Sequence, residues 1–275
     1  MNENAHTEHI LLTGGTGMTG RRITARLAEA GVRTRVGSRS GDPRFDWHDR
    51  STWDAVLDGV TGVYLCYHPD LAFPGAAETV AAFAERAARA GVRRMALLSG
   101  RGEERAQLAE QLVREVFPGL AVLRCAMFAQ DFSESFLLGP VLAGTVALPM
   151  PDVPEPFVDL DDVAEVAVRT LTEDGHAGAL YELTGPKALT FAEATAAVSE
   201  VAGREVTYQV VSAEEFVDLV VGAGESAELG HGLVALLAEI LDGRNVHPAD
   251  GVERALGRPA TPFADYVRKT AGTWR

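Results

Sequence analysis

Short apolar runs alternate with longer stretches of helical periodicity through the first half of the chain. The runs are too short for a helix and rich in Val, Leu, Ile or aromatic residues: His9–Gly14, Arg33–Arg39, Gly62–His68, Arg93–Gly100 and Ala121–Phe128. Helical patterns separate them at Thr19–Ala30, Ser51–Asp58, Gly75–Ala90 and Glu103–Phe117. Strands that alternate with crossover helices form a parallel sheet covered on both faces. The pattern therefore predicts an α/β fold with a Rossmann, doubly wound parallel sheet.

The second half of the chain is less regular and mainly helical. One strand is expected at Ala179–Leu183, and helices at Ser133–Leu142, Leu160–Leu171, Thr190–Ala202, Ala213–Val221, Ala227–Gly243, Ala249–Leu256 and Phe263–Ala271. The segment Pro149–Pro156 contains four prolines and must be extended. We expect a nucleotide-binding core over residues 1–150 and a smaller substrate lobe over residues 151–275, packed as one compact unit.

Composition narrows the class of protein. The chain has 275 residues, of which 47% are hydrophobic and 23% charged, as in soluble globular proteins. A net charge of −14 argues against nucleic-acid binding, and no apolar run approaches the ~20 residues that span a bilayer. Cys66 and Cys125 lie in apolar segments without metal-ligand spacing, so no metal site is expected. The polar segment Met1–Glu8 lacks the apolar core of a secretion signal, which predicts a cytoplasmic protein. Both a monomer and a homodimer stay open.

A glycine-rich loop follows the first predicted strand and opens a helix. Gly14 supplies the tight turn, Gly17 allows close approach of the backbone to a pyrophosphate, and Gly20 lets the helix pack on the strand. The helix N-terminus then faces the phosphates. The alternative is a glycine-rich turn without a ligand. The position of the loop, at the head of five strand–helix units, favours a dinucleotide site formed by Gly14, Gly15, Thr16, Gly17, Met18, Thr19 and Gly20.

The end of the second predicted strand indicates the type of dinucleotide. NAD-binding proteins place a carboxylate about 20 residues beyond the glycines, where it binds the ribose hydroxyls. This chain has Ser38 and Arg39 there instead, with no acidic residue before Asp42. An arginine at this position pairs with a 2′-phosphate, and a serine donates to it. We therefore expect NADP(H), with Arg21 as a second candidate and a solvated surface arginine as the alternative for Arg39.

Three further stretches carry a family resemblance. They are Phe45–Asp49 followed by Thr52–Trp53, Val63–Pro69, and Leu123–Phe128. Together with the glycine loop they resemble the NmrA-like branch of the atypical short-chain dehydrogenase/reductases. Within that branch they are most similar to the ergot-alkaloid reductases of the festuclavine synthase and agroclavine dehydrogenase type.

The resemblance implies a path for the cofactor across the strand ends. Asp46 and Trp47 would border the adenine, and Tyr67, His68 and Pro69 would lie along the ribose and pyrophosphate. Ser99 and Gly100 would lie near the nicotinamide, with Cys125, Ala126 and Phe128 beside it. Other readings stay open: Trp47 and Trp53 as core aromatics, Cys125 as a packing residue, and His68 without a role.

The usual catalytic pair of the wider superfamily is absent. Most short-chain dehydrogenases use a tyrosine with a lysine four positions on, and none of the five tyrosines here has one. Either the protein binds a dinucleotide without turning it over, or its reaction needs little proton chemistry. Hydride addition to an iminium is of that kind, and solvent can protonate a reduced quinone or enone. The candidate proton donors are Tyr67, His68, Ser99 and Asp131, although Asp131 can equally be a helix cap.

Three phenylalanines at a spacing of four are candidates for the substrate wall: Phe128, Phe132 and Phe136. The segment Gly222–Ser226 has the composition of a hinge and is a candidate lid. The leading hypothesis is an NADPH-dependent reductase of a small apolar electrophile of iminium, quinone or enone type, with a place in secondary metabolism. The alternatives are a non-catalytic NADP-sensing regulator and a dehydratase, cyclase or epimerase on the same fold.

Overall fold

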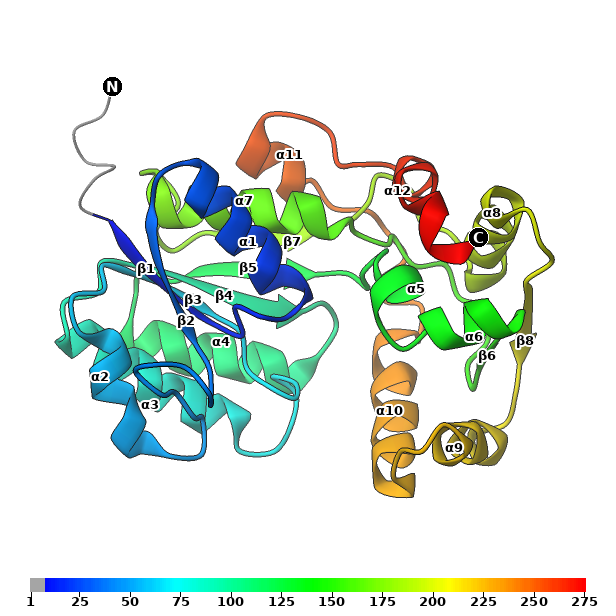
Figure 1. The fold of residues 1–275 in the computed structure, drawn as a ribbon, viewed down its shortest axis with the longest axis horizontal. Coiled ribbons are helices and arrows are strands. Elements are labelled where there is room, and N and C mark those ends of the chain that lie inside the picture. The colour runs from blue at the N-terminus through cyan, green and yellow to red at the C-terminus, as the bar shows by residue number, and fades with distance from the viewer. Residues whose placement is uncertain (1–7) are drawn as a thin grey trace. The chain divides into compact units, whose positions relative to one another are not determined.

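The computed structural model describes residues 8–275 (Figure 1); the rest of the polar N-terminal segment, where we expected no secretion signal, lies outside them. The described chain divides into two units. Unit 1 comprises residues 8–125, Leu160–Leu183 and Asp250–Arg258, and unit 2 comprises Ala126–Asp159, Thr184–Ala249 and Pro259–Arg275. This division differs from the expected single boundary at residue 150. The reason is that two later segments return to unit 1: Leu160–Leu183 adds the last strand of its sheet, and Asp250–Arg258 adds a helix that packs on that strand.

Unit 1 contains a six-stranded parallel sheet in the order β2-β1-β3-β4-β5-β7. The strands are β1 (His9–Thr13), β2 (Arg33–Gly37), β3 (Gly62–Leu65), β4 (Arg94–Gly100), β5 (Ala121–Cys125) and β7 (Leu180–Leu183). The strand order reverses at β1, because β2 pairs with one side of β1 and β3 with the other. Ligands of such sheets bind outside the carboxyl ends of the strands at this reversal. The sheet confirms the predicted Rossmann-type α/β fold.

Helices cover both faces of this sheet, as its nearly continuous apolar strands require. Helices α1 (Met18–Glu29) and α7 (Leu160–Thr172) pack together on one face (Figure 1). The other face carries α2 (Trp53–Leu57), α3 (Ala76–Arg89) and α4 (Glu104–Val116) (Figure 1). Helix α11 (Gly251–Leu256) packs on β7, and Arg258 after it pairs with the buried Asp162 of α7 at 2.9 Å. These contacts anchor the last segment of unit 1.

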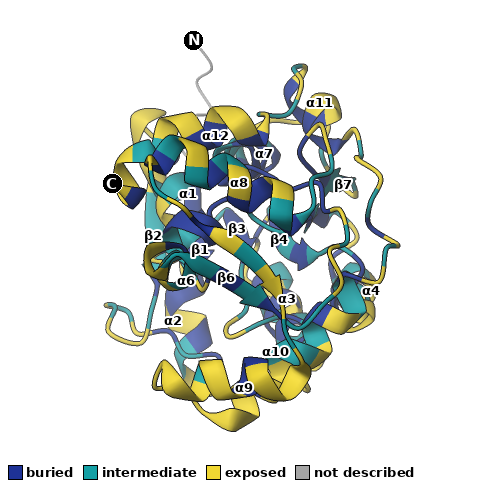
Figure 2. Ribbon diagram, turned by 90° about the vertical axis from the view of Figure 1, so that its right-hand side faces the viewer, coloured by how far each residue is buried: buried dark blue, intermediate teal, exposed yellow. Residues whose placement is uncertain are grey.

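Unit 2 is mainly helical but contains a small sheet that we did not predict. Strands β6 (Thr145–Leu148) and β8 (Thr207–Val210) pair in parallel. The helices are α5 (Asp131–Glu134), α6 (Leu138–Ala143), α8 (Phe191–Ala202), α9 (Ala213–Gly222), α10 (Ala227–Ile240) and α12 (Phe263–Thr270), and a 3-10 turn follows at Ala271–Trp274. Phe132, Phe157, Phe191 and Phe263 pack against one another in the core. Helices α9 and α10 are largely exposed (Figure 2).

Two details of unit 2 bear on the predictions. The single helix expected at Ser133–Leu142 is wrong, because Ser135 has extended backbone (φ −137°, ψ −152°) and separates α5 from α6. The predicted hinge Gly222–Ser226 is the turn between α9 and α10, where Gly224 has a φ of +94° and Ser226 caps α10. Its role as a lid stays a prediction.

None of the helices in residues 8–275 has the length and apolar character that a membrane span requires.

Candidate functional site

The glycine loop forms a tight turn between β1 and α1. Gly14 has a left-handed φ of +75°, and the Gly17 amide donates to the Gly14 carbonyl at 2.9 Å. A Cβ at Gly20 would lie 2.3 Å from the Gly14 carbonyl oxygen and 2.5 Å from the Gly15 Cα. A side chain at Gly15 would collide with Val36 of β2. The turn therefore requires glycine at Gly14, because of its φ, and at Gly20, because of the backbone beside it.

The N-terminus of α1 is open toward solvent. Gly17 is its N-cap residue and offers no side-chain cap, and no acidic residue lies in the first turn. Thr16 and Gly17 are exposed. The first amide groups of a helix are donors without intrahelical partners, and the helix dipole adds positive potential there. The residues present thus fit a phosphate group, as the predicted dinucleotide requires.

Thr13 joins the base of this loop to the neighbouring strand. Its hydroxyl donates to the Tyr64 carbonyl at 3.1 Å and accepts from the Cys66 amide at 2.9 Å. A Cβ at Gly14 would lie 3.3 Å from the Cys66 Sγ. The carboxyl ends of β1 and β3 are therefore held together beneath the loop, at the point where the strand order reverses.

Arg39 is exposed after the end of β2, and its guanidinium makes no hydrogen bond or ion pair with residues 8–275. The half-buried Ser38 accepts backbone hydrogen bonds from Gly41 and Phe45, at 3.1 and 2.8 Å. The loop beyond β2 thus folds back and leaves Arg39 in solvent. A guanidinium in this condition can pair with a phosphate without losing an internal partner.

Asp46 and Trp47 are engaged within unit 1. The Asp46 carboxylate accepts from Arg44 at 2.8 Å and from the His48 amide at 3.0 Å. Trp47 is 8% exposed, and its ring centroid lies 4.9 Å from that of Phe45. Trp47 therefore belongs to the aromatic core, together with the buried Trp53 and Phe83. Contact of Asp46 and Trp47 with adenine stays a prediction.

The residues after β3 differ in exposure. Tyr67 is half-buried, its ring lies 5.2 Å from that of Trp47, and burial raises the pKa of its phenol. His68 and Pro69 are exposed. They follow a strand next to the reversal point, where dinucleotides bind in folds of this kind. Tyr67 keeps its proton at neutral pH and is available as a donor.

Ser99 is bound into a buried polar network on the α4 side of the sheet. Its hydroxyl donates to Glu110 of α4 at 2.6 Å, and the same carboxylate accepts from Arg124 of β5 at 2.5 Å. Arg124 also pairs with Glu182 of β7 at 3.2 Å. Ser99 is thus a structural donor in the described fold. Its neighbour Cys125 is buried, which raises the pKa of the thiol and makes it unreactive.

Asp131 is a buried carboxyl group at the start of α5, in unit 2. Burial raises its pKa to about 7, although hydrogen bonds from the Phe128 backbone and Ser135 lower it. Nearby, the Tyr266 hydroxyl donates to Ser133 at 2.7 Å. A carboxyl group that titrates near neutrality can donate or accept a proton, so Asp131 stays a candidate proton donor.

The three candidate phenylalanines do not form one wall. Phe132 is fully buried in the core of unit 2, Phe136 is 41% exposed, and Phe128 is half-buried. Phe128 precedes α5, and the extended residue Ser135 turns the chain before Phe136. The interruption of the helix removes the common face that a spacing of four would produce. A substrate contact of Phe128 stays a prediction.

Glu103 was not singled out from the sequence, although it is a buried carboxylate at the end of the sheet. It precedes α4 and is 9% exposed. A Cβ at Gly100 would lie 1.9 Å from its Oε1. The signal available in the sequence is the pair Gly100 and Gly102 around a short turn after a strand, followed by an acid.

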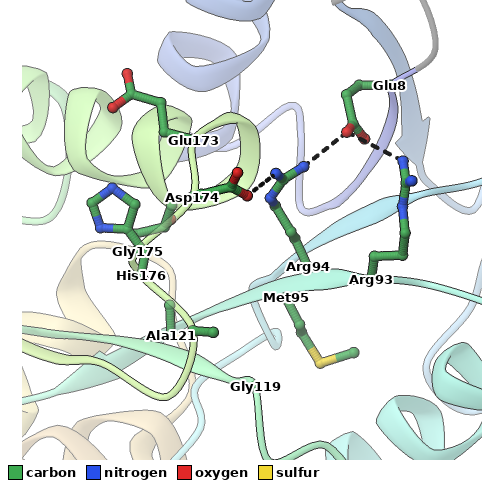
Figure 3. Close-up of a pocket in the computed structure, with 12 residues that line it drawn as sticks. Glu8, Arg93, Arg94, Met95, Gly119, Ala121, Glu173, Asp174, Gly175 and His176 are labelled. Atoms are coloured by element: carbon green, nitrogen blue, oxygen red, sulfur yellow. Dashed lines mark hydrogen bonds and ion pairs between the residues drawn. The ribbon is translucent and has the colours of Figure 1, made fainter. Parts of the chain in front are cut away.

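A polar pocket of about 380 Å³ lies at the opposite edge of the sheet, near the amino ends of β1, β4 and β5 (Figure 3). Its charges already pair: Arg94 donates to the buried Glu8 at 2.8 Å and to Asp174 at 2.7 Å, and Arg93 donates to Glu8 at 3.2 Å. Ligands of such sheets bind at the other edge. The pocket is thus an ion-pair network that ties strands together. No cluster of potential metal ligands occurs in residues 8–275.

No family model matches the chain, but proteins of similar sequence span nearly all of it. It is 31% identical over 278 residues to the uncharacterized oxidoreductase YesF of Bacillus subtilis, covering 96% of each chain. It is 31% identical over 290 residues to (4-alkanoyl-5-oxo-2,5-dihydrofuran-3-yl)methyl phosphate reductase of Streptomyces griseus, covering 95% and 98%. It is 29% identical over 288 residues to agroclavine dehydrogenase of Claviceps fusiformis, covering 96% and 98%.

Solved structures share the fold over the same extent. Triphenylmethane reductase of Citrobacter, complexed with NADP(H), has a TM-score of 0.75 at 23% identity and covers 95% and 99%. The quinone oxidoreductase QOR2 of Escherichia coli, complexed with NADPH, has a TM-score of 0.75 at 20% identity and covers 94% and 99%. At these identities the likeness concerns the fold.

Proposed function

The chain belongs to the NmrA-like branch of the atypical short-chain dehydrogenase/reductases, and on that premise we propose that it is an NADPH-dependent reductase of a small apolar electrophile. Its relatives named as an oxidoreductase, a dihydrofuranyl-methyl phosphate reductase and agroclavine dehydrogenase confirm the resemblance drawn from the motifs. Iminium ions, quinones and enones are the substrate types that require least proton chemistry from the protein.

The observation that carries the proposal is the loop Gly14–Gly20. Its closure depends on the absence of a side chain at Gly20, where a Cβ would lie only 2.3 Å from the Gly14 carbonyl oxygen, and the helix behind it presents amide groups without a side-chain cap. Backbone amides and a helix dipole are suited to a pyrophosphate. A turn that served only to connect β1 with α1 would not need this close packing together with an open helix end.

Selection of NADPH is assigned to Arg39. Its guanidinium is exposed beside the end of β2, and the half-buried Ser38 precedes it. An arginine forms two parallel hydrogen bonds to a phosphate, which NADH lacks at the 2′ position. The structures of NADP(H)-complexed triphenylmethane reductase and NADPH-complexed QOR2 support this choice.

The cofactor, when bound, supplies a hydride to the electrophilic carbon of the substrate. The protein binds and orients the reactants and excludes water. A quinone or enone also takes up a proton, for which Asp131 and Tyr67 are the candidate donors besides solvent. Ser99 is set aside for this role because its hydroxyl donates to Glu110.

Fluorescence titration with NADPH and NADH tests the cofactor. We expect tighter binding of NADPH, and a 10- to 100-fold loss of that preference in Arg39→Ala, the range of a hydrogen-bonded charge pair (about 1.5–3 kcal/mol). Arg105→Ala is the control, because Arg105 is also exposed but lies on α4. Equal affinity for NADH in the wild type would contradict the role of Arg39.

Oxidation of NADPH with a panel of cyclic iminium ions, quinones and enones tests the reaction. Turnover of at least one class is expected. Tight binding of NADPH without turnover of any class would instead favour the sensing function, and release of water or isomerisation without net oxidation would favour the non-redox reactions.

A further inference from the structure

The turn between β4 and α4 folds a carboxylate back over the end of the sheet. β4 ends at Gly100, Gly102 has a left-handed φ of +83°, and Glu103 immediately precedes α4. A Cβ at Gly100 would lie 1.9 Å from the Glu103 Oε1 and 2.0 Å from its Cδ. Any side chain at Gly100 would therefore displace the carboxylate. The Glu103 carboxylate fills the space that a side chain at Gly100 would occupy.

The carboxylate lies at the carboxyl ends of β4 and β5, on the face of the sheet away from α4. Gly100 pairs in parallel register with Cys125, and residues in register share a face. The preceding Ser99 points to the other face, where it meets Glu110 of α4. Burial, and after it the negative charge of Glu103, raises the pKa of the Cys125 thiol, as a carboxylate on the same face of the sheet would.

The order of the strands places Glu103 near the nicotinamide end of the cofactor. This inference rests on the proposed function. In the proposed function, the pyrophosphate binds at the loop after β1, and Arg39 after β2 binds the adenosine end of the cofactor. The other end of the dinucleotide then extends past β3 toward β4 and β5, in the observed strand order. β4 lies two strand spacings, about 10 Å, from β1. Glu103 therefore lies near the nicotinamide end of the dinucleotide.

We propose that Glu103 is a specificity-determining residue that favours electrophiles carrying a positive charge at the reacting group over neutral ones. When NADPH reduces an iminium ion, a C–H bond of the dihydronicotinamide breaks, its hydride forms the new C–H bond at the iminium carbon, and the C=N π pair becomes a nitrogen lone pair. The positive charge passes from the substrate to NADP⁺ and so remains near the carboxylate. A quinone or enone becomes an oxyanion, which the same carboxylate repels.

The test compares a cationic and a neutral substrate in matched variants. N-methyl-3,4-dihydroisoquinolinium is the cation and menadione the neutral quinone, and NADPH oxidation gives kcat/KM. We expect Glu103→Gln to lower kcat/KM for the cation about 10- to 100-fold, as loss of a charge-assisted contact does, and to preserve or raise that for menadione. Glu104→Gln is the control, because Glu104 is adjacent and exposed. Gly100→Ala, which displaces the carboxylate, should lose the same selectivity.

Binding of the cation, measured by calorimetry with NADP⁺ present, separates this inference from the proposed function. Absence of turnover in the wild type would contradict the function, whereas weaker cation binding in Glu103→Gln would still support the selectivity. Equal affinity of wild type and Glu103→Gln for the cation, or an equal loss of activity with both substrates, would overturn the role of Glu103.

Discussion

Exposure separates the residues of the candidate site into two groups. Arg39 and His68 are exposed at strand ends, where an anionic ligand can meet them. Ser99 and Cys125 are buried and held within the fold. Asp131 belongs to neither group, because it is buried and yet its pKa lies near neutrality. Its protonation should therefore be visible in both stability and activity.

The stability prediction concerns Asp131→Asn. Burial raises the pKa of Asp131 from 3.8 to about 7, so between these values the folded protein holds a proton that the unfolded chain has released. The free energy of unfolding must then fall as the pH rises through this range, by roughly 4 kcal/mol. Asn carries no titrating proton and should remove that fall, so the stability of the variant relative to the wild type should rise between about pH 4 and pH 7. Urea unfolding below and above this range measures the effect. A difference between variant and wild type that does not change with pH would contradict it.

A second residue-scale prediction concerns Gly20→Ala. The added Cβ would meet the Gly14 carbonyl at 2.3 Å, so the loop must shift. We expect a destabilisation of about 1–3 kcal/mol and a loss of NADPH affinity by about tenfold or more. Gly139→Ala is the control, because its Cβ would have no neighbour within 4 Å. Unchanged NADPH affinity in Gly20→Ala would show that the loop does not hold the pyrophosphate.

The ends of helices depend on residues close in the sequence, whereas the pairing of strands depends on residues far apart. α8 begins with a capping box in which the Thr190 hydroxyl accepts from the Glu193 amide, and α9 begins with the equivalent pair Ser212 and Glu215. These are short-range patterns that a sequence displays. The strands β6 and β8 have only four residues each, and their pairing connects positions about 60 residues apart. Local patterning therefore predicted α8 but not this sheet.

The capping box of α8 should contribute measurably to the stability of the protein. Thr190→Ala removes the acceptor for the Glu193 amide and should lower the free energy of unfolding by about 1 kcal/mol. Thr190→Ser keeps the hydroxyl and should behave nearly as the wild type. Urea unfolding followed by circular dichroism measures both. Equal stability of the alanine and serine variants would mean that the cap contributes nothing.

The charge of the whole molecule opposes an anionic cofactor. The chain has a net charge of −14, so binding of NADPH depends on attraction concentrated at the glycine loop and Arg39. A ligand that binds only the folded state stabilises it by mass action. The bound cofactor should therefore be detectable in the unfolding of the entire protein.

Thermal unfolding supplies that test. NADPH at about 100 times its Kd contributes roughly 2.7 kcal/mol, which raises Tm by roughly 5–10 °C for a protein of this size. NADH at the same concentration should raise Tm less, and Arg39→Ala should make the two shifts equal. A shift of equal size for both dinucleotides in the wild type would contradict selection of the 2′-phosphate.

The sequence by itself determined the parallel sheet, the glycine loop and most helices of this protein. Each depends on residues close in the chain: an apolar run, the spacing of Gly14, Gly17 and Gly20, or a cap such as Thr190. It also indicated the family, since the motifs after β2, β3 and β5 are short and contiguous. These features follow from local sterics and periodicity, which a linear pattern records.

Only the tertiary structure decided which candidate side chains are occupied by the fold itself. Ser99 meets Glu110 across eleven positions, and Arg124 joins Glu110 to Glu182 of β7. Phe132 enters the core, and Glu103 is folded back onto Gly100 by the turn after β4. The partners of a polar or aromatic side chain are chosen by strand order, register and turn geometry. Those are long-range properties, so residue type alone predicts where chemistry is available but not which atoms remain free to perform it.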